Sequence, residues 1–441
     1  MYQPKMELTQ EQRDLLQGRQ GATVAKMMEV IVRYGDTFNA KRLVKITHSK
    51  GHLVTSFGIN MLTPVYPLMD ELKKVQIYAK DGFTLDPRPM DYENVKASWL
   101  ERFVSKHIIY GKQYHYETQL QSLGLKDLKD FSCTCYLNEI GNTPKKGDIL
   151  SWAESSAVVY ANSVLGARCN RNSGIIEMFQ MLLGYVPEFG FLTNEGRKAS
   201  WKVIVKTSKR PSPQVLGSAI GMKVTSDVPY IVGLDRFLSK LPDDYTIAYL
   251  KDFGAACASN GSVGLYHIKN ITPEAVDLDD TLLKDEYQTY VIDDDELERV
   301  KNSYPIMWKK TNSKPTKCFI GCPHLSYDQL KRYSYAILDG LVEARRNKLV
   351  IDTIFTASPK VLEKFEREDP ELRQQILDAG VHLSYICPLM FVDNPLSGKK
   401  PIITNSNKLR TYSSCRYYDD DEIISIITGK EKCRWKSLKV E

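Results

Sequence analysis

The stretch Cys318-Phe319-Ile320-Gly321-Cys322-Pro323-His324-Leu325-Ser326 opens the part of the chain whose pattern decides the fold. A short apolar strand over residues 318–321 precedes a predicted helix over residues 326–345, which begins with a capping box. A strand over residues 349–355, a helix over residues 358–379 and a strand over residues 381–386 follow. Consecutive strand–helix–strand units make a parallel sheet with right-handed crossovers, so the sequence predicts a doubly wound α/β fold.

The length of the chain predicts several domains. The 441 residues correspond to about three domains of ordinary size. Helices and strands also alternate before residue 293, whereas residues 293–317 are acidic and polar without a sustained period and are typical of a linker. We therefore expect three α/β domains with mostly parallel sheets, over residues 1–125, 126–300 and 301–441.

Composition excludes several classes of protein. With 42% hydrophobic and 26% charged residues the chain can bury a core, so it is not a disordered protein. The net charge of +6 is small and its signs are interspersed, which is not the pattern of a nucleic-acid-binding protein. No apolar run reaches the roughly 20 residues of a membrane span and no signal pattern opens the chain, so we expect a cytoplasmic protein without membrane contact.

Three of the nine cysteines stand at chemically suggestive positions. Cys322 and Cys387 each follow a predicted strand and precede a proline, at the sheet edge where ligands bind in doubly wound folds. Cys133 lies in a polar, irregular segment. Three dispersed thiolates could hold an iron–sulfur cluster with one iron open to a substrate hydroxyl. The alternatives are buried cysteines without a function, and a structural zinc bound by three cysteines and His324.

A helix rich in small residues within residues 152–165 is followed by two arginines, Arg168 and Arg171. Guanidinium groups suit a carboxylate or phosphate of a substrate. The alternative is that both side chains interact with the carboxyl end of the preceding helix.

Several longer signatures, in this order along the chain, resemble the catalytic large subunit of the aconitase X family, a branch of the aconitase superfamily. The resemblance covers residues 8–408. The segments that carry it are His48-Ser49-Lys50-Gly51, Cys133-Thr134-Cys135-Tyr136, the block from Trp152 to Arg171, Thr272-Pro273-Glu274-Ala275, Gly321-Cys322-Pro323-His324-Leu325-Ser326 and Thr404-Asn405-Ser406-Asn407-Lys408.

The resemblance implies a hydro-lyase with an aconitase-like core that lacks the swivel domain. It implies an iron–sulfur centre held by Cys133, Cys322 and Cys387, whose nuclearity stays open between two-iron, four-iron and mononuclear forms. It also implies a separate small swivel subunit that brings a catalytic serine. The further site residues that we expect are, for catalysis, Ser155, Asn162, His324 and Lys408, and, for binding of a small hydroxy acid, His48, Arg168, Arg171 and Ser406.

This chain departs from the family pattern at five places, one of which is the segment Leu409-Arg410-Thr411. Cys135 replaces a proline, Cys169 a threonine and Asn407 a glycine, and residues 52–57 differ from the usual segment. Cys135 could therefore compete with Cys133 as a ligand, and a non-catalytic binding paralogue is a second hypothesis. The family's substrates include cis-3-hydroxy-L-proline, which we expect here, and mevalonate 5-phosphate, which is the alternative.

Overall fold

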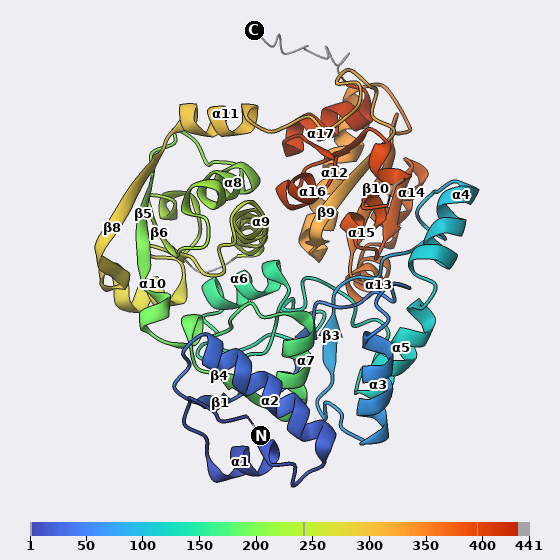
Figure 1. Cartoon of the computed structure of the whole chain (residues 1–441). Coiled ribbons are helices and arrows are strands. Elements are labelled where there is room, and N and C mark those ends of the chain that lie inside the picture. The colour runs from blue at the N-terminus through green and yellow to red at the C-terminus, as the bar shows by residue number, and fades with distance from the viewer. Residues whose placement is uncertain (1, 241–242, 395, 431–441) are drawn as a thin grey trace.

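Three bodies of secondary structure surround a common centre in the computed structural model, which describes residues 2–240, 243–394 and 396–430 (Figure 1). The N-terminal body lies below, the second body on the left and the C-terminal body on the right in this view. Cys433 lies outside the described residues. The mixed helix and parallel-sheet architecture confirms the predicted α/β class.

The C-terminal body is built on a five-stranded sheet in the order β11-β10-β9-β12-β13, in which every neighbouring pair is parallel. All nine residues of the central strand β9 are buried. The strands are β9 (Lys317–Leu325), β10 (Asp352–Ala357), β11 (Val381–Ser384), β12 (Ile402–Thr404) and β13 (Arg416–Tyr417). The helices are α12 (Tyr327–Glu343), α13 (Pro359–Glu368), α14 (Pro370–Asp378), α15 (Pro388–Val392), α16 (Asn407–Tyr412) and α17 (Asp420–Thr428).

The structure confirms the parallel sheet and the capping box of α12 and corrects two details. The predicted helix over residues 358–379 is two helices, because Pro370 has no amide hydrogen for the helix ladder and begins α14 instead. The predicted strand over residues 318–321 continues through Cys322 to Leu325, so this cysteine lies inside β9 rather than after it.

The second body contains a four-stranded parallel sheet in the order β7-β6-β5-β8. Its strands are β5 (Ala199–Val205), β6 (Pro229–Val232), β7 (His267–Ile268) and β8 (Leu283–Ile292), and its helices are α8 (Pro213–Val224), α9 (Asp244–Asn260), α10 (Pro273–Leu278) and α11 (Asp294–Asn302). The predicted linker over residues 293–317 therefore begins with a helix, since Asp293 caps α11 through the amide of Glu296.

The N-terminal body is mainly helical and has two small sheets. β1 (Leu43–Lys45) pairs antiparallel with β4 (Tyr185–Pro187), and β2 (Gly51–Leu53) pairs parallel with β3 (Phe83–Leu85). The helices of this body are α1 (Gln10–Leu16), α2 (Ala22–Thr37), α3 (Val65–Lys74), α4 (Trp99–Phe103), the π-helix η1 (Val104–Ile109), α5 (Gln113–Ser122) and α7 (Gly174–Leu183). The β1–β4 pair joins residues about 140 positions apart. The predicted boundary near residue 125 stays a prediction.

Helix α6 (Ser155–Ser163) lies where the three bodies meet, and eight of its nine residues are buried (Figure 1). It packs against α9 of the second body, and residues of α6 share a hydrophobic cluster with β9 and β10. In the part of the chain that the structure describes, no helix has the length and apolar character that a membrane crossing requires.

Candidate active site

The strand order of the C-terminal sheet creates a natural binding edge. From β9, the next two strands along the chain, β10 and β11, are added on one side of the sheet. The last two, β12 and β13, lie on the other side of β9, so the strand order reverses between β9 and β12. In open α/β sheets, ligands bind at the carboxyl ends of the strands at such a reversal. Cys322 near the end of β9 and Lys408 after β12 flank this point, and Cys387 follows β11.

The three predicted metal ligands converge from different parts of the fold. Cys133 and Cys322 lie within electrostatic range of each other, as do Cys322 and Cys387. Burial raises the pKa of all three thiols, that of Cys387 to about 12, while the nearby ammonium of Lys408 works in the opposite direction on each. Cys387 is partly exposed and the other two are buried.

His324 connects the three segments that carry these cysteines. Its backbone N–H donates to Cys133 Sγ at 3.4 Å. Its ring contacts Ser132 Oγ at 3.4 Å through Nδ1 and the carbonyl oxygen of Ile386 at 3.1 Å through Nε2. Burial lowers the pKa of His324 to about 4, so the ring is neutral at pH 7. Because both ring nitrogens are engaged, the geometry gives this histidine a positioning role between the thiols.

A buried ion pair lies beside the thiols. Lys408 Nζ contacts Glu154 Oε1 at 2.5 Å, and Glu154 also accepts from the amide of Ala157 and the hydroxyl of Ser156. Burial would raise the pKa of Glu154, but the charge and hydrogen bond of Lys408 lower it to about 2. Burial would lower the pKa of Lys408, but Glu154 and the nearby thiols hold it well above its usual value. Both groups are therefore charged at neutral pH.

The sequence did not single out a second polar group, formed by Asp86, His52 and Glu177. His52 Nε2 lies 3.4 Å from Asp86 Oδ1, yet neither atom has a partner with hydrogen-bond geometry among the described residues, and neither does Glu177 Oε2. Burial raises the pKa of Asp86 to about 6 and that of Glu177 well above its usual value. A buried carboxyl that titrates near neutrality is a candidate acid–base group. The signal available in the sequence was the loop that begins at Asp86.

The thiols match an iron centre in donor type and number, but they are not arranged as a finished metal site. Among residues 2–430 outside the two short gaps, no three or more His, Cys, Asp or Glu side chains are arranged so that they could hold a metal ion. Iron–sulfur clusters take cysteine thiolates, and binding must therefore deprotonate these thiols and draw them together. The charge of Lys408 lowers the cost of the deprotonation.

Two further predicted residues lie next to this centre. The Ser406 hydroxyl donates to the carbonyl oxygen of Cys322 and accepts from the amide of Leu409, so it fixes the start of α16 against β9. Ser155 opens α6 directly after Glu154, with 3.4 Å between its hydroxyl and the Glu154 carboxylate. The structure thus brings these serines together with the three thiols, His324 and Lys408.

Of the four other predicted residues, three already have partners and the fourth is exposed. Asn162 is buried and holds the loop at Cys169 through its amide nitrogen and oxygen. Arg168 donates to the carbonyl oxygen of Leu192 and to the Asn194 side chain, and Arg171 is exposed. His48 contacts Asn142 at 2.7 Å. Their predicted catalytic and substrate-binding roles stay predictions.

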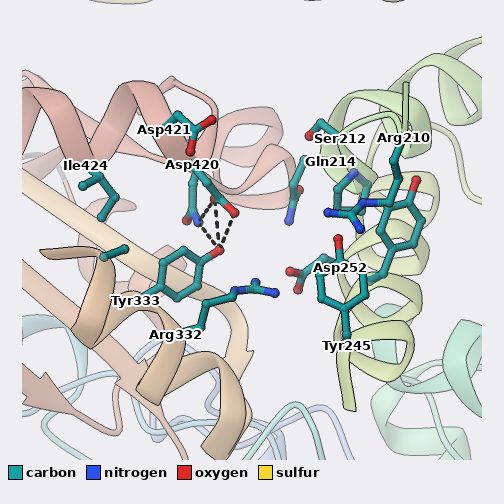
Figure 2. Close-up of a pocket in the computed structure, with 14 residues that line it drawn as sticks. Arg210, Ser212, Gln214, Tyr245, Asp252, Arg332, Tyr333, Asp420, Asp421 and Ile424 are labelled. Atoms are coloured by element: carbon teal, nitrogen blue, oxygen red, sulfur yellow. Dashed lines mark hydrogen bonds between the residues drawn. The ribbon is translucent and has the colours of Figure 1, made fainter. Parts of the chain in front are cut away.

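A pocket of about 250 Å³ opens between the second and C-terminal bodies, next to Asn405 and therefore close to Lys408 in the chain (Figure 2). Arg210 and Arg332 approach the ring of Tyr245 from opposite walls, at 4.2 and 5.7 Å from its centroid. In the described part of the chain neither guanidinium has a carboxylate within ion-pairing distance. The lining residues are Arg210, Ser212, Pro213, Gln214, Tyr245, Tyr249, Asp252, Arg332, Tyr333, Ala336, Asn405, Asp420, Asp421 and Ile424.

Two acids of this pocket already have partners. Asp252 accepts from Lys251 at 2.8 Å and from Gln329 at 2.9 Å. Asp420 accepts from the hydroxyl of Tyr333 at 3.0 Å and from Asn405 at 2.8 Å. Neither guanidinium group forms an ion pair in the described part of the chain, and Asp252 and Asp420 lie within electrostatic range of Arg332.

Comparison with known proteins decides the family. Residues 5–195 match the model of the aconitase X first domain, and residues 200–302 match that of the aconitase X second domain. The phosphomevalonate dehydratase large subunit of Thermococcus kodakarensis is 30% identical to this chain, over 81% of this chain and 82% of the relative. The chain belongs to the aconitase X family. The resemblance read from the sequence is thereby confirmed.

Other members of the family agree with this assignment. The phosphomevalonate dehydratase large subunit of Methanosarcina mazei is 29% identical and matches over 92% of both chains. The cis-3-hydroxy-L-proline dehydratase of Pseudomonas aeruginosa is 26% identical, over 90% of this chain but only 65% of the relative. The crystal structure of Thermococcus kodakaraensis aconitase X in its holo form covers 96% of this chain with a TM-score of 0.77 at 27% identity. These relatives are dehydratases, so the predicted enzyme class, a hydro-lyase, is confirmed.

Proposed function

We propose that this aconitase X chain is the large subunit of an iron–sulfur-dependent dehydratase of a small hydroxy acid. The observation that carries the proposal is the convergence of Cys133, Cys322 and Cys387 beside the Lys408–Glu154 pair at the reversal of the sheet. A cluster bound by these thiols would supply a Lewis acid for the substrate hydroxyl. The second candidate is a non-catalytic paralogue, which would bind metal but dehydrate no hydroxy acid.

The chain's own residues set the electrostatics of this centre. The ammonium of Lys408, held by Glu154, favours the deprotonated form of the neighbouring thiols. His324 fixes the relative positions of the three cysteine segments, as described above. Asp86, with a pKa of about 6, holds or releases a proton at Oδ1 near neutral pH.

The anionic group of the substrate requires a binding site of its own. The candidates for it are Arg210 and Arg332, which line the pocket of Figure 2. Two guanidinium groups without a carboxylate partner suit a carboxylate or a phosphate. The pocket borders Asn405, at the start of the segment that leads to Lys408. The alternative binding site for this anion is formed by Arg168 and Arg171, the arginines expected from the sequence.

A separate small subunit completes the proposed enzyme. The relatives in T. kodakarensis and M. mazei are named large subunits, and this chain covers 82% and 92% of their lengths. The two cis-3-hydroxy-L-proline dehydratases are covered over only 52% and 65%, so a third or more of each lies outside the match. We propose that the small subunit has the swivel fold and that the complex acts in the cytoplasm.

Two substrates remain candidates. The sequence favoured cis-3-hydroxy-L-proline, and two relatives carry that name. The match to the large-subunit relatives over most of both chains favours mevalonate 5-phosphate. We propose mevalonate 5-phosphate as the first substrate to assay and cis-3-hydroxy-L-proline as the second.

Anaerobic co-expression with the small subunit from the same organism tests the whole proposal. Iron and sulfide are measured in the purified complex and in the Cys322→Ala variant, and dehydration of both substrates is then assayed. We expect iron in the wild-type complex, its loss in the variant and turnover of one substrate. Unchanged iron in Cys322→Ala would remove the cluster assignment, and an iron-loaded complex that converts neither substrate in this assay or in a broad hydroxy-acid screen would favour the paralogue.

A further inference from the structure

A series of polar contacts leads through the N-terminal body from His48 to the acid–base candidate Asp86. The ring Nε2 of His48 lies 2.7 Å from Asn142 Oδ1. Asn142 Nδ2 donates to Thr84 Oγ1 at 2.8 Å, and Thr84 Oγ1 lies 2.9 Å from His52 Nδ1. The other ring nitrogen, His52 Nε2, faces Asp86 Oδ1 at 3.4 Å. We call these five side chains, from three separate segments, the His48–Asp86 series.

The pairing of β2 with β3 places the inner half of this series on one face. His52 of β2 lies directly opposite Thr84 of β3 in the parallel register. Asp86 follows two positions after Thr84, and its backbone N–H still donates to β2 at 3.0 Å, so its side chain shares that face. The ring of Trp152 meets the rings of His52 and His48 edge-on, with centroids 5.7 and 6.3 Å away. Packing therefore fixes both imidazole rings.

The middle of the series is closed to water. His52, Thr84 and Asn142 are fully buried, whereas the side chain of His48 at the outer end is 19% exposed and that of Asp86 at the inner end is 20% exposed. Buried polar groups cannot replace a lost partner with water, so each of them keeps the orientation that its neighbours give it. His52 can therefore act on a bound molecule only through Asp86.

The hydrogens available in the series place one proton between His52 and Asp86. Thr84 has a single hydroxyl hydrogen, which goes to His52 Nδ1 or to the carbonyl oxygen of Gly51 at 3.3 Å. In the first pattern the neutral ring carries its hydrogen on Nε2. In the second, Nδ1 donates to Thr84, and the contact of Nε2 with Asp86 Oδ1 needs a proton on the ring or on the carboxyl. Both patterns therefore orient Asp86 through a proton held against His52.

The inner end of the series lies at the thiol site. Asp86 is within electrostatic range of Lys408. It is also within range of Cys133 and Cys387. The position of its carboxyl group relative to these groups therefore depends on the contact with His52, and a change at Thr84 is transmitted to the site.

We propose that Asn142, Thr84 and His52, anchored by His48 at the outer end, are positioning residues that hold Asp86 in place as the acid–base group of the dehydration. This inference rests on the proposed function for that role of Asp86. It places His48 in the support of Asp86 instead of in contact with the substrate.

Thr84→Val tests the inference, because it removes one buried hydroxyl and keeps the shape of the side chain. In the complex with the small subunit from the same organism, we expect kcat for the substrate that wild type converts to fall about 10- to 100-fold, with KM within about threefold. Thr84→Ser keeps the hydroxyl and should retain kcat within about threefold. Thr353→Val, which removes a buried hydroxyl near the amino end of β10, is the matched control and should leave kcat unchanged.

A double variant separates positioning from a general structural effect. Asp86→Asn should lower kcat about 100-fold or more. Thr84→Val/Asp86→Asn should lose no more than Asp86→Asn alone, because Thr84 acts only through Asp86. Losses that multiply in the double variant would contradict the inference.

Nuclear magnetic resonance of the full chain with nitrogen-15-labelled histidine gives a readout that does not depend on activity. We expect a ring N–H signal that is protected from solvent exchange and that His52→Gln removes. This signal should shift in Thr84→Val, which takes away the partner of Nδ1, and return to its wild-type position in Thr84→Ser. An identical signal in Thr84→Val and wild type would overturn the series.

His48→Ala tests the same series at its outer end and serves if Thr84→Val loses the circular dichroism spectrum of wild type. We expect a lower kcat with KM within about threefold. A higher KM with an unchanged kcat would place His48 at the substrate and overturn the inference. Wild-type kcat in both Thr84→Val and His48→Ala would overturn it and leave the proposed function intact, whereas an iron-loaded wild-type complex that converts neither substrate would contradict both.

Discussion

Cys133 and Cys135 are two residues apart but face different surroundings. Cys133 Sγ accepts the backbone N–H of His324 and lies within range of Cys322 and Lys408. Cys135 is fully buried and lies within electrostatic range of His52 rather than of Lys408. The geometry therefore favours Cys133 as the ligand in the competition that the sequence left open.

Iron content should discriminate between these two thiols. We expect Cys133→Ser to lower iron in the anaerobically purified complex to near background, because a thiolate ligand is lost, whereas Cys135→Ser should keep the wild-type amount. Metal analysis with normalisation to protein measures both. Cys257→Ser, a buried cysteine of α9, is the control, and equal losses in the Cys133 and Cys135 variants would contradict the assignment.

Arg332 should act on substrate binding rather than on the chemical step. Replacing this arginine by glutamine removes a charge-assisted contact to the substrate anion, which is worth about 1.5–3 kcal/mol. We expect KM to rise about 10- to 100-fold with a smaller change in kcat. Steady-state kinetics of the complex measure both parameters, with Arg367→Gln, an exposed arginine of α13, as the control. An unchanged KM would leave Arg168 and Arg171 as the anion-binding candidates.

At the scale of elements, α8 and α9 approach closely because two glycines of α8 face α9. A Cβ atom at Gly217 would lie 2.5 Å from the carbonyl oxygen of Phe253, and one at Gly221 would lie 2.6 Å from that of Cys257. These are backbone atoms that cannot move aside without displacing a helix. The pair forms the core of the second body, which flanks the pocket of Figure 2.

Gly221→Ala should therefore destabilise the chain. Overpacking of this kind costs about 1–3 kcal/mol, which exceeds the gain of about 1 kcal/mol in helix propensity. The free energy of unfolding from urea titration measures the balance. Gly340→Ala in α12 is the control with a smaller expected loss, since its new methyl group would meet side-chain atoms of Thr428 and Ile424. Equal stability of Gly221→Ala and wild type would show that the helices can separate freely.

The stability that Glu101 of α4 provides through its contacts with Ser397 and Lys400 should depend on pH. Burial would raise the pKa of Glu101, but Lys400, Ser98 and Ser397 lower it to about 2. A folded-state pKa below the unfolded value gives stability that is present above about pH 4.5 and is lost as the pH falls towards 2. Because Lys400 is partly exposed, solvent screening reduces the effect of this ion pair, and Glu101→Gln should be less stable than wild type by about 2 kcal/mol at pH 6. This difference should shrink as the pH falls through 2. Urea unfolding at several pH values measures it; a pH-independent difference would contradict the titration.

At the scale of the whole molecule, the buried Lys251 and the largely buried Lys408 join separate bodies around the site. Lys408 of the C-terminal body pairs with Glu154 at the start of α6, 254 positions earlier in the chain. Lys251 of α9 is 1% exposed and donates to the carbonyl oxygen of His324 at 3.1 Å, and to Asp252 at 2.8 Å. The bodies are thus fixed to one another at the functional centre.

Lys251→Met should destabilise the contact between α9 of the second body and β9 of the C-terminal body. Removing one partner of a buried charged group leaves the other uncompensated, at a cost of about 3–5 kcal/mol for a fully buried pair and less here, because Asp252 keeps its bond to Gln329. We expect a lower midpoint of thermal unfolding and a lower iron content, measured on the purified complex. Lys348→Met, at an exposed site, is the control; a wild-type midpoint in Lys251→Met would show that the junction does not depend on this lysine.

The assignment of the three thiols as ligands stays a prediction, whereas the sequence by itself determined the α/β class, the parallel C-terminal sheet and the cap of α12. These features follow from local periodicity, from capping residues and from the rule that parallel strands end at one edge, and the family signatures added the enzyme class. The sequence signal for the split of residues 358–379 into two helices is Pro370, which cannot continue the helix ladder.

Only the tertiary structure decided which polar groups meet. The Glu154–Lys408 pair, the Asp86–His52 contact and the approach of Arg210 and Arg332 to the ring of Tyr245 join segments that are far apart in the chain, and no periodicity encodes such contacts. The engagement of Asn162 and Arg168 with neighbouring loops was likewise invisible, because residue type shows what a side chain can bind but not which atoms the fold brings within reach. Burial then set the charges of these groups, and burial is a property of the folded molecule.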